Sequence, residues 1–249
     1  MKKSFQTGIF AIVTALALVV GKTAHAQMPG MDAAMMKLFG DNKSFTTDAD
    51  MAMNATNGTQ LLGMPMNISQ LNGQSRTEVD MSQAKGAMLP PEAIQQMKMM
   101  NMTKIISIIK PDTKTMLMIY PGMTAYVEAP VPKEQADALA KDPNIVKAKL
   151  GTETLNGHPC VKYKVIVTST TGQKSEFTLW AATDLNEFPV RLESTVPQGK
   201  ITINYKNTKL EKPDAKTFEA PAGYTKYASQ EEFQAAMMQK MMGGATAPK

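Results

Sequence analysis

The clearest pattern in the chain is an alternation of apolar and polar residues within the region 151–194. Over 161–167, valine or tyrosine occupies every second position, which is the period of a strand with one apolar face. The pair Asn156 and Gly157 before this stretch and Gly172 after it are tight-turn signals, and further alternating stretches follow. The region is therefore predicted to be an antiparallel β-meander.

The same alternation predicts strands in much of the remaining chain. They are expected near residues 45–55, 64–68, 74–81, 104–110, 114–120, 124–128, 146–154 and 201–210. The stretches 104–110 and 114–120 are unusual because both of their faces are apolar. Such strands are either covered on both sides, or packed on one face while the other lines an apolar cavity.

Short helices are predicted between these strands. Their expected ranges are 31–39, 91–100, 132–141 and 229–242. Gly40 stops the first helix, Pro91 suits the first turn of the second, and Ser229 is an N-cap followed by two glutamates in the last. The expected fold class is mainly β (α+β), with short helices lying across a long antiparallel sheet.

The first residues have the pattern of a cleavable secretory signal. Lys2 and Lys3 precede an apolar run from 9 to 20, and a small-x-small motif ends at Ala26. The run is shorter than the roughly 20 residues that a membrane-spanning helix needs, so a retained anchor is the weaker interpretation. We expect residues 1–26 to be removed, which makes the protein periplasmic or secreted with no integral membrane segment after processing.

The remaining sequence predicts one domain. No internal repeat or linker divides it, so we expect a single domain over 27–242 and a disordered tail over 243–249. Loss of the signal removes three of the 27 basic residues, leaving 24 against 22 acidic ones and a net charge near +2. With this small charge and only six Tyr and one Trp, the chain gives no reason to expect nucleic acid as a partner.

The residues that usually perform chemistry are sparse. After His25 leaves with the signal, His158 is the one histidine, and it lies beside Pro159 in a predicted turn. Cys160 is the one cysteine, so no intramolecular disulfide can form, and we expect a structural thiol rather than a reactive one. No convergent carboxylate pair and no glycine-rich loop before a helix is evident. We therefore expect no catalytic residues, no metal site formed by such residues, no cofactor and no enzyme activity.

Methionine is the anomaly in the composition, with 22 residues in 249. Several methionines are spaced by two on predicted strands, so each pair points to one face. Three interpretations compete: ordinary core filling, a deformable apolar cavity, or thioether ligands for Cu(I). On the second interpretation, the residues expected to line the cavity are Met51, Met53, Met64, Met66, Ile106, Ile108, Met116 and Met118.

Short motifs spread over 45–227 resemble an exported family of domains of unknown function. These motifs are Arg76–Glu78, Met118–Tyr120, Tyr126–Glu128, Gly151–Gly157 with Cys160 and Lys162-Tyr163, Trp180–Ala182, Phe188-Pro189 and Phe218–Tyr224. The order of elements is also similar to that of the periplasmic lipoprotein carriers of the LolA and LolB type. This resemblance implies a LolA-like sheet curled into an incomplete barrel, with short covering helices as lids, but it brings no functional residue.

Three functions remain open at this point. The first is a binding or carrier module for a hydrophobic ligand such as a lipid, an acyl chain or a lipoprotein. The alternatives are a methionine-rich copper-binding protein of the envelope and a structural or interaction domain without a ligand. The positions of the methionines discriminate the first two, because a carrier needs them on one concave sheet surface and a copper site needs them on exposed segments.

We predict that the exported protein begins at Gln27. The small residues at Ala24 and Ala26 fit the peptidase, and the apolar run is too short to remain as a stable anchor. Mass spectrometry of the intact protein from the periplasmic or culture fraction tests this. Recovery of residues 1–26 on protein in the membrane fraction would contradict it.

Overall fold

The structure, a computed structural model, describes residues 37–131, 144–168, 172 and 174–243. The predicted signal peptide and the helix expected over 132–141 lie outside these residues. Of the helix expected over 31–39, the described part is the final turn.

The described residues form one sheet with two helices and several 3-10 turns. The strands are β1 (Ser44–Asn54), β2 (Gln60–Leu71), β3 (Gln74–Asp80), β4 (Lys104–Lys110), β5 (Thr115–Tyr120), β6 (Ala125–Pro130), β7 (Asn144–Leu155), β8 (His158–Thr168), β9 (Lys174–Ala182), β10 (Phe188–Val196), β11 (Gly199–Lys209) and β12 (Thr225–Tyr227). The helices and turns are η1 (Lys37–Phe39), η2 (Met81–Gln83), α3 (Pro91–Met99), η3 (Pro121–Met123), η4 (Thr183–Leu185), η5 (Ala215–Phe218) and α5 (Gln230–Gly243). The strands and both helices predicted within this part of the chain are confirmed.

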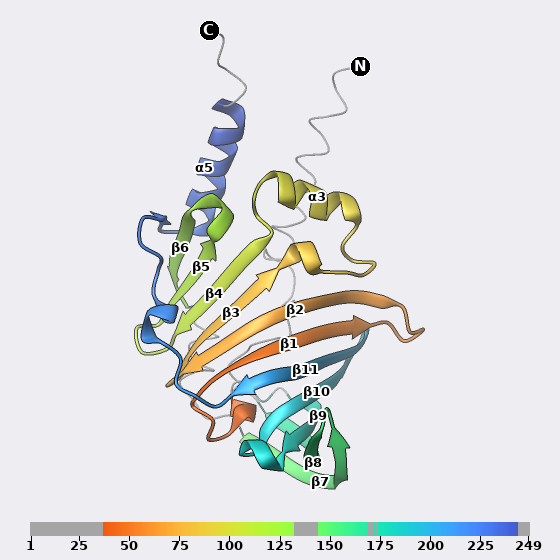
Figure 1. Cartoon of the computed structure of the whole chain (residues 1–249). Helices are drawn as coiled ribbons and strands as arrows, with labels where there is room; N and C mark the ends of the chain where they lie inside the picture. The colour runs from red at the N-terminus through yellow and green to blue at the C-terminus, as the bar shows by residue number, and fades with distance from the viewer. Residues whose placement is uncertain (1–36, 132–143, 169–171, 173, 244–249) are drawn as a thin grey trace.

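Strand order shows how the sheet is assembled. The order is β12-β6-β5-β4-β3-β2-β1-β11-β10-β9-β8-β7, and each pairing is antiparallel apart from that of β12 with β6. Two meanders, β1 to β6 and β7 to β11, are therefore joined where β1 pairs with β11. The resulting sheet is long, curled and not closed (Figure 1). The expected fold class is confirmed: a mainly β protein with an incomplete antiparallel barrel and short helices.

One face of this sheet, here called the inner face, holds the main hydrophobic core. Pairing of Met51 on β1 with Met64 on β2 and with Ile203 on β11 places these side chains on that face. The core cluster continues over β10, β9 and β8 and includes residues of η1, η2 and α3. The turns η1 and η2 and the helix α3 therefore cover the inner face.

Four aromatic rings form the centre of this core. Phe39 of η1 contacts Phe45, Phe188 and Tyr205, with ring centroids 4.7, 5.3 and 5.5 Å away. Burial raises the pKa of the Tyr205 hydroxyl above its usual value. Because Phe45 is the second residue of β1 and Phe188 is the first residue of β10, η1 links the two meanders across the inner face.

The opposite, outer face carries one buried apolar cluster around Cys160, Trp180 and Ala182 on β8 and β9, and another near β4 and β5. There Phe218 of η5 packs on Ile106, Ile108, Leu117 and Ile119 in a separate buried cluster. This explains why β4 and β5 are apolar on both faces, since both faces are covered.

Elsewhere the outer face is charged. Lys206 pairs with Asp50 at 2.6 Å, and Lys164 pairs with Glu176 at 2.9 Å. These exposed pairs mark a solvated surface and contribute little to stability.

At the β12 edge, α5 covers the inner face. Phe233 of α5 stacks on Tyr120, with ring centroids 4.5 Å and ring planes 8° apart. Tyr227 of β12 packs edge-on against the ring of Phe233, with centroids 5.4 Å apart. The inner face is thus covered by α3 and η1 over its middle and by α5 at one end (Figure 1).

We predict that Phe39→Ala lowers the free energy of unfolding by about 3–5 kcal/mol, the usual cost of removing a fully buried ring. Phe39 is 1% exposed and contacts rings from both meanders. Urea unfolding followed by circular dichroism measures the change. Met99→Ala is the control, since Met99 is 80% exposed and its loss should change stability by less than about 0.5 kcal/mol. Equal effects of the two substitutions would contradict the role given to η1.

Candidate functional site

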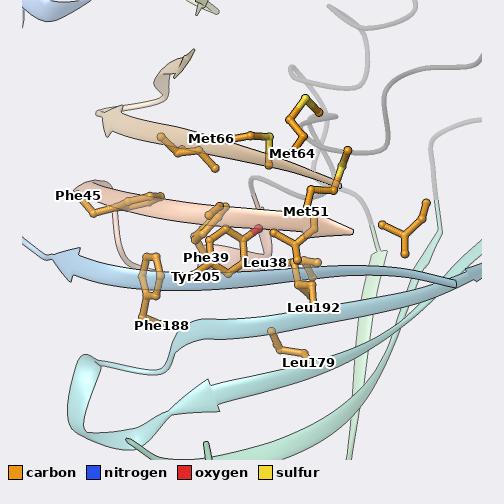
Figure 2. Close-up of a cluster of buried hydrophobic side chains, with 14 of the residues drawn as sticks. Leu38, Phe39, Phe45, Met51, Met64, Met66, Leu179, Phe188, Leu192 and Tyr205 are labelled. Atoms are coloured by element: carbon orange, nitrogen blue, oxygen red, sulfur yellow. The ribbon is translucent and has the colours of Figure 1, made fainter. Parts of the chain in front are cut away.

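Methionines gather at one place on the inner face. The methionine cluster comprises Met51 and Met53 of β1, Met64 and Met66 of β2, Met81 of η2 and Met97 of α3. Figure 2 shows Met51, Met64 and Met66 close together on the side of the sheet where Leu38 and Phe39 also lie. Four of the eight predicted cavity residues are therefore brought together, and two methionines that the prediction did not include join them.

Strand register explains this gathering. Met51 pairs with Met64 and Ala49 pairs with Met66, so alternate residues of β1 and β2 lie side by side. Met51 and Met64 are each 3% exposed, whereas Met53 at the end of the row is half-buried. The sheet side of the cluster is thus fixed by two adjacent strands.

The elements that cover the methionine cluster, η2 and α3, each contribute one buried side chain to the core. Met97 is the buried residue of α3, while Met99 two positions later is 80% exposed. At η2, the Asp80 carboxylate accepts a hydrogen bond from the Ser82 backbone N–H at 2.9 Å. Hydrogen bonding to Ser82 lowers the pKa of Asp80, so this cap is charged at neutral pH. η2 is therefore anchored by its cap, whereas α3 depends on Met97.

Two further predicted residues, Met116 and Met118, share the inner face but lie apart from the cluster. Met118 pairs with Ser107 on β4 and packs against the hydrophobic cluster around Tyr120 and Phe233. Met116 pairs with Ile109 and is half-buried. These methionines lie toward the end of the sheet that α5 covers.

The last two predicted residues, Ile106 and Ile108, lie on the outer face. They are 7% and 0% exposed and pack with Phe218. The structure therefore places six of the eight predicted residues on one face and these two on the other.

The hollows on the surface of the described residues include two of about 350 and 360 Å³, both open to solvent. The first is lined by Glu176–Thr178, Glu193–Thr195 and Lys200, and the second by Thr152–Thr154, Pro159–Val161 and Thr183. Neither hollow contains any of the eight predicted residues. Five of the six residues of the methionine cluster are buried, so a molecule bound there must replace side-chain contacts.

A buried polar side chain that the sequence interpretation missed lies on the same face. Gln70 of β2 is 7% exposed, and its Oε1 has no hydrogen-bond partner within the described part of the chain. Across the sheet it faces Phe45 on β1 and Ser75 on β3, and Ser75 is itself 2% exposed. The sequence contained an indication of this, since Gln70 continues the series of alternate positions that starts with Met64 and Met66 and so lies on the same face of the strand.

The thiol of Cys160 is buried and lies near His158 and Asp184. The thiol is 3% exposed and its Sγ donates to the backbone carbonyl oxygen of His158 at 3.3 Å. Burial raises the pKa of this thiol. The Nδ1 atom of His158 lies 2.8 Å from a carboxylate oxygen of Asp184. Among the residues that the structure describes, no three or more His, Cys, Asp or Glu side chains are grouped to hold a metal ion.

Comparison with known proteins gives one family and a set of similar folds. The family model described as Domain of unknown function (DUF4412) matches residues 61–188. No curated protein sequence matches the chain.

Several solved structures share the general layout. LprF from Mycobacterium bovis is 15% identical with a TM-score of 0.37, and the match covers 73% of this chain and 94% of that one. The lipoprotein LppX from Mycobacterium tuberculosis is 11% identical with a TM-score of 0.39, covering 71% and 93%. A LolA superfamily protein from Nitrosomonas europaea is 11% identical with a TM-score of 0.34, covering 76% and 98%. At these values the likeness says nothing about ligand or activity.

We predict that Cys160 reacts slowly with a thiol reagent in the folded protein. Burial restricts access to Sγ, and the raised pKa lowers the thiolate fraction at any given pH below it. Titration with a chromogenic disulfide at pH 8, in buffer and in urea, measures the two rates. Equally fast reaction in both states would contradict the burial of the thiol.

Proposed function

The chain belongs to the domain-of-unknown-function family DUF4412, and we propose that it is an exported binding or carrier module for a hydrophobic ligand, such as a lipid, an acyl chain or a lipoprotein. The family prediction made from short motifs is confirmed by this match. Export rests on the signal pattern before Gln27. None of the described helices is long and apolar enough to cross a membrane.

The observation that supports this proposal is the methionine cluster on the inner face. Methionine is unbranched and its thioether is polarisable, so such a surface can adapt to an irregular or variable apolar partner. Six methionines from four elements belong to one buried core cluster, which is more than ordinary core filling requires. A ligand site that must change shape benefits from methionines, because their flexible side chains can rearrange around the ligand.

The thin cover over the cluster supports entry of a ligand. Release of one buried side chain such as Met97 costs about 1.5–3 kcal/mol, and each methylene of a ligand that becomes buried returns about 0.8 kcal/mol. About two to four buried methylenes therefore offset the displacement of α3. A long acyl chain exceeds this requirement several-fold.

The proposed function includes no catalysis and no copper. A Cu(I) site would need methionine sulfurs together on accessible segments. The strongly exposed methionines of the described part, Met88, Met99 and Met238, lie before α3, within α3 and within α5. The six of the methionine cluster belong to the core, which favours an apolar ligand over an ion.

We predict saturable binding of the neutral fluorescent probe N-phenyl-1-naphthylamine to the processed protein. Met53→Asp should weaken this binding at least about tenfold, because a carboxylate at the half-buried end of the cluster opposes an apolar ligand. Fluorescence titration measures the dissociation constant, and circular dichroism verifies that the sheet persists.

Met99→Asp is the matched control, since it adds the same charge at an exposed position of α3 and should leave the dissociation constant unchanged. Equal weakening by both substitutions would argue against the methionine cluster as the site. If the unsubstituted protein gives no saturable signal, the carrier proposal fails, and a structural or interaction domain without a ligand becomes the better description.

A further inference from the structure

Gln70 lies at one end of a row of inner-face residues on β2. Met64, Met66 and Ile68 precede it at every second position, and each is buried. A strand rises about 3.3 Å per residue, so Met64 and Gln70 are separated by about 20 Å. The row therefore begins with flexible apolar side chains and ends with a buried amide.

This amide is costly for the fold. A buried polar atom without a partner destabilises the folded state, whereas leucine at the same position would avoid this penalty. The Oε1 atom of Gln70 has no partner among the described residues. A hydrogen bond to a bound molecule would offset the cost.

The surroundings of Gln70 restrict the chemistry of that molecule. Its cross-strand neighbours are Phe45 and Ser75, and Ser75 in turn faces Ile109 on β4. None of these side chains carries a charge. An ionised head group would be buried there without a counter-charge, which is far more costly than burying a neutral one. A free Oε1 lone pair requires a donor, so the partner must present an N–H or O–H group.

We propose that the inner face binds a neutral amphiphile whose N–H or O–H donor pairs with Oε1 of Gln70 while its alkyl chain lies along β2 toward the methionine cluster. This assignment rests on the proposed function and adds the class of the head group to it. The acyl amide is the simplest such molecule, either as a free lipid or as an acyl chain attached to a peptide. Free fatty acids and phospholipid head groups fit less well.

Displacement of N-phenyl-1-naphthylamine by three compounds of equal chain length tests this assignment. Palmitamide offers a donor, methyl palmitate offers only acceptors, and palmitate carries a charge. Palmitamide should displace the probe at about one tenth of the concentration of methyl palmitate, since the recovered hydrogen bond is worth about a factor of ten. Palmitate should bind most weakly of the three and displace the probe only at the highest concentration.

Gln70→Leu should bring the ratio between palmitamide and methyl palmitate close to one and leave the affinity for methyl palmitate unchanged. Gln70→Met is a second variant of similar length, for use if leucine disturbs the fold. Gln60→Leu is the matched control, because Gln60 is an exposed glutamine at the start of β2, and it should keep the tenfold ratio. An N-palmitoyl peptide in place of palmitamide distinguishes a protein-attached chain from a free lipid.

Three results would overturn the assignment: equal or tighter binding of methyl palmitate by the unsubstituted protein, tighter binding of palmitate than of palmitamide, or an equal loss of both neutral ligands in Gln70→Leu. Absence of any probe binding is a different result, since it removes the proposed function itself. Saturable probe binding with no head-group preference leaves the carrier proposal intact and removes only the role of Gln70.

Discussion

The pairing of β1 with β11 is the interaction on which the rest of the structure depends. It joins residues about 150 positions apart, such as Met51 with Ile203 and Ala49 with Tyr205, and it turns two meanders into one sheet. Each meander alone would expose the apolar side chains of its inner face to water, at about 25 cal/mol per Å². Joined, they bury a single core that reaches from β2 to β8. The methionine cluster lies beside this junction, so the same contact that completes the fold also assembles the candidate site.

Most elements could be predicted from the sequence because their signals are local. Alternation gave the strands, and the Asn156-Gly157 turn is present with both residues at positive φ, as a tight hairpin requires. The pairing of β1 with β11 could not be predicted, because alternation states which residues share a face but not which strand lies alongside. The three-residue strand β12 was also missed, since Thr225–Tyr227 is too short to show a period and its parallel pairing with β6 depends on the preceding chain.

For the candidate site too, the sequence showed which residues of one strand share a face but not which strands lie side by side. Parity within one strand correctly grouped Met51 with Met53 and Met64 with Met66, and register then brought the two pairs together. On β4 parity could not decide, because isoleucines occupy both faces and only the position of Phe218 assigns Ile106 and Ile108 to the outer one. Gln70 illustrates a different difficulty. A polar residue on the apolar face of a strand can be recognised as buried only when the neighbouring strands that cover it are known.

The residues of the inner face suit one surface to both folding and the proposed binding. A core of leucine and isoleucine would have well-defined rotamers and a fixed shape. Methionine buries a comparable apolar surface but keeps three rotatable bonds, so it packs closely when the site is empty and rearranges at small cost. The rigid aromatic rings around Phe39 lie at the junction of the meanders, and the soft methionines lie next to them under α3. The aromatic rings thus supply the fixed part of one core, and the methionines beside them supply the part that we propose adapts to a ligand.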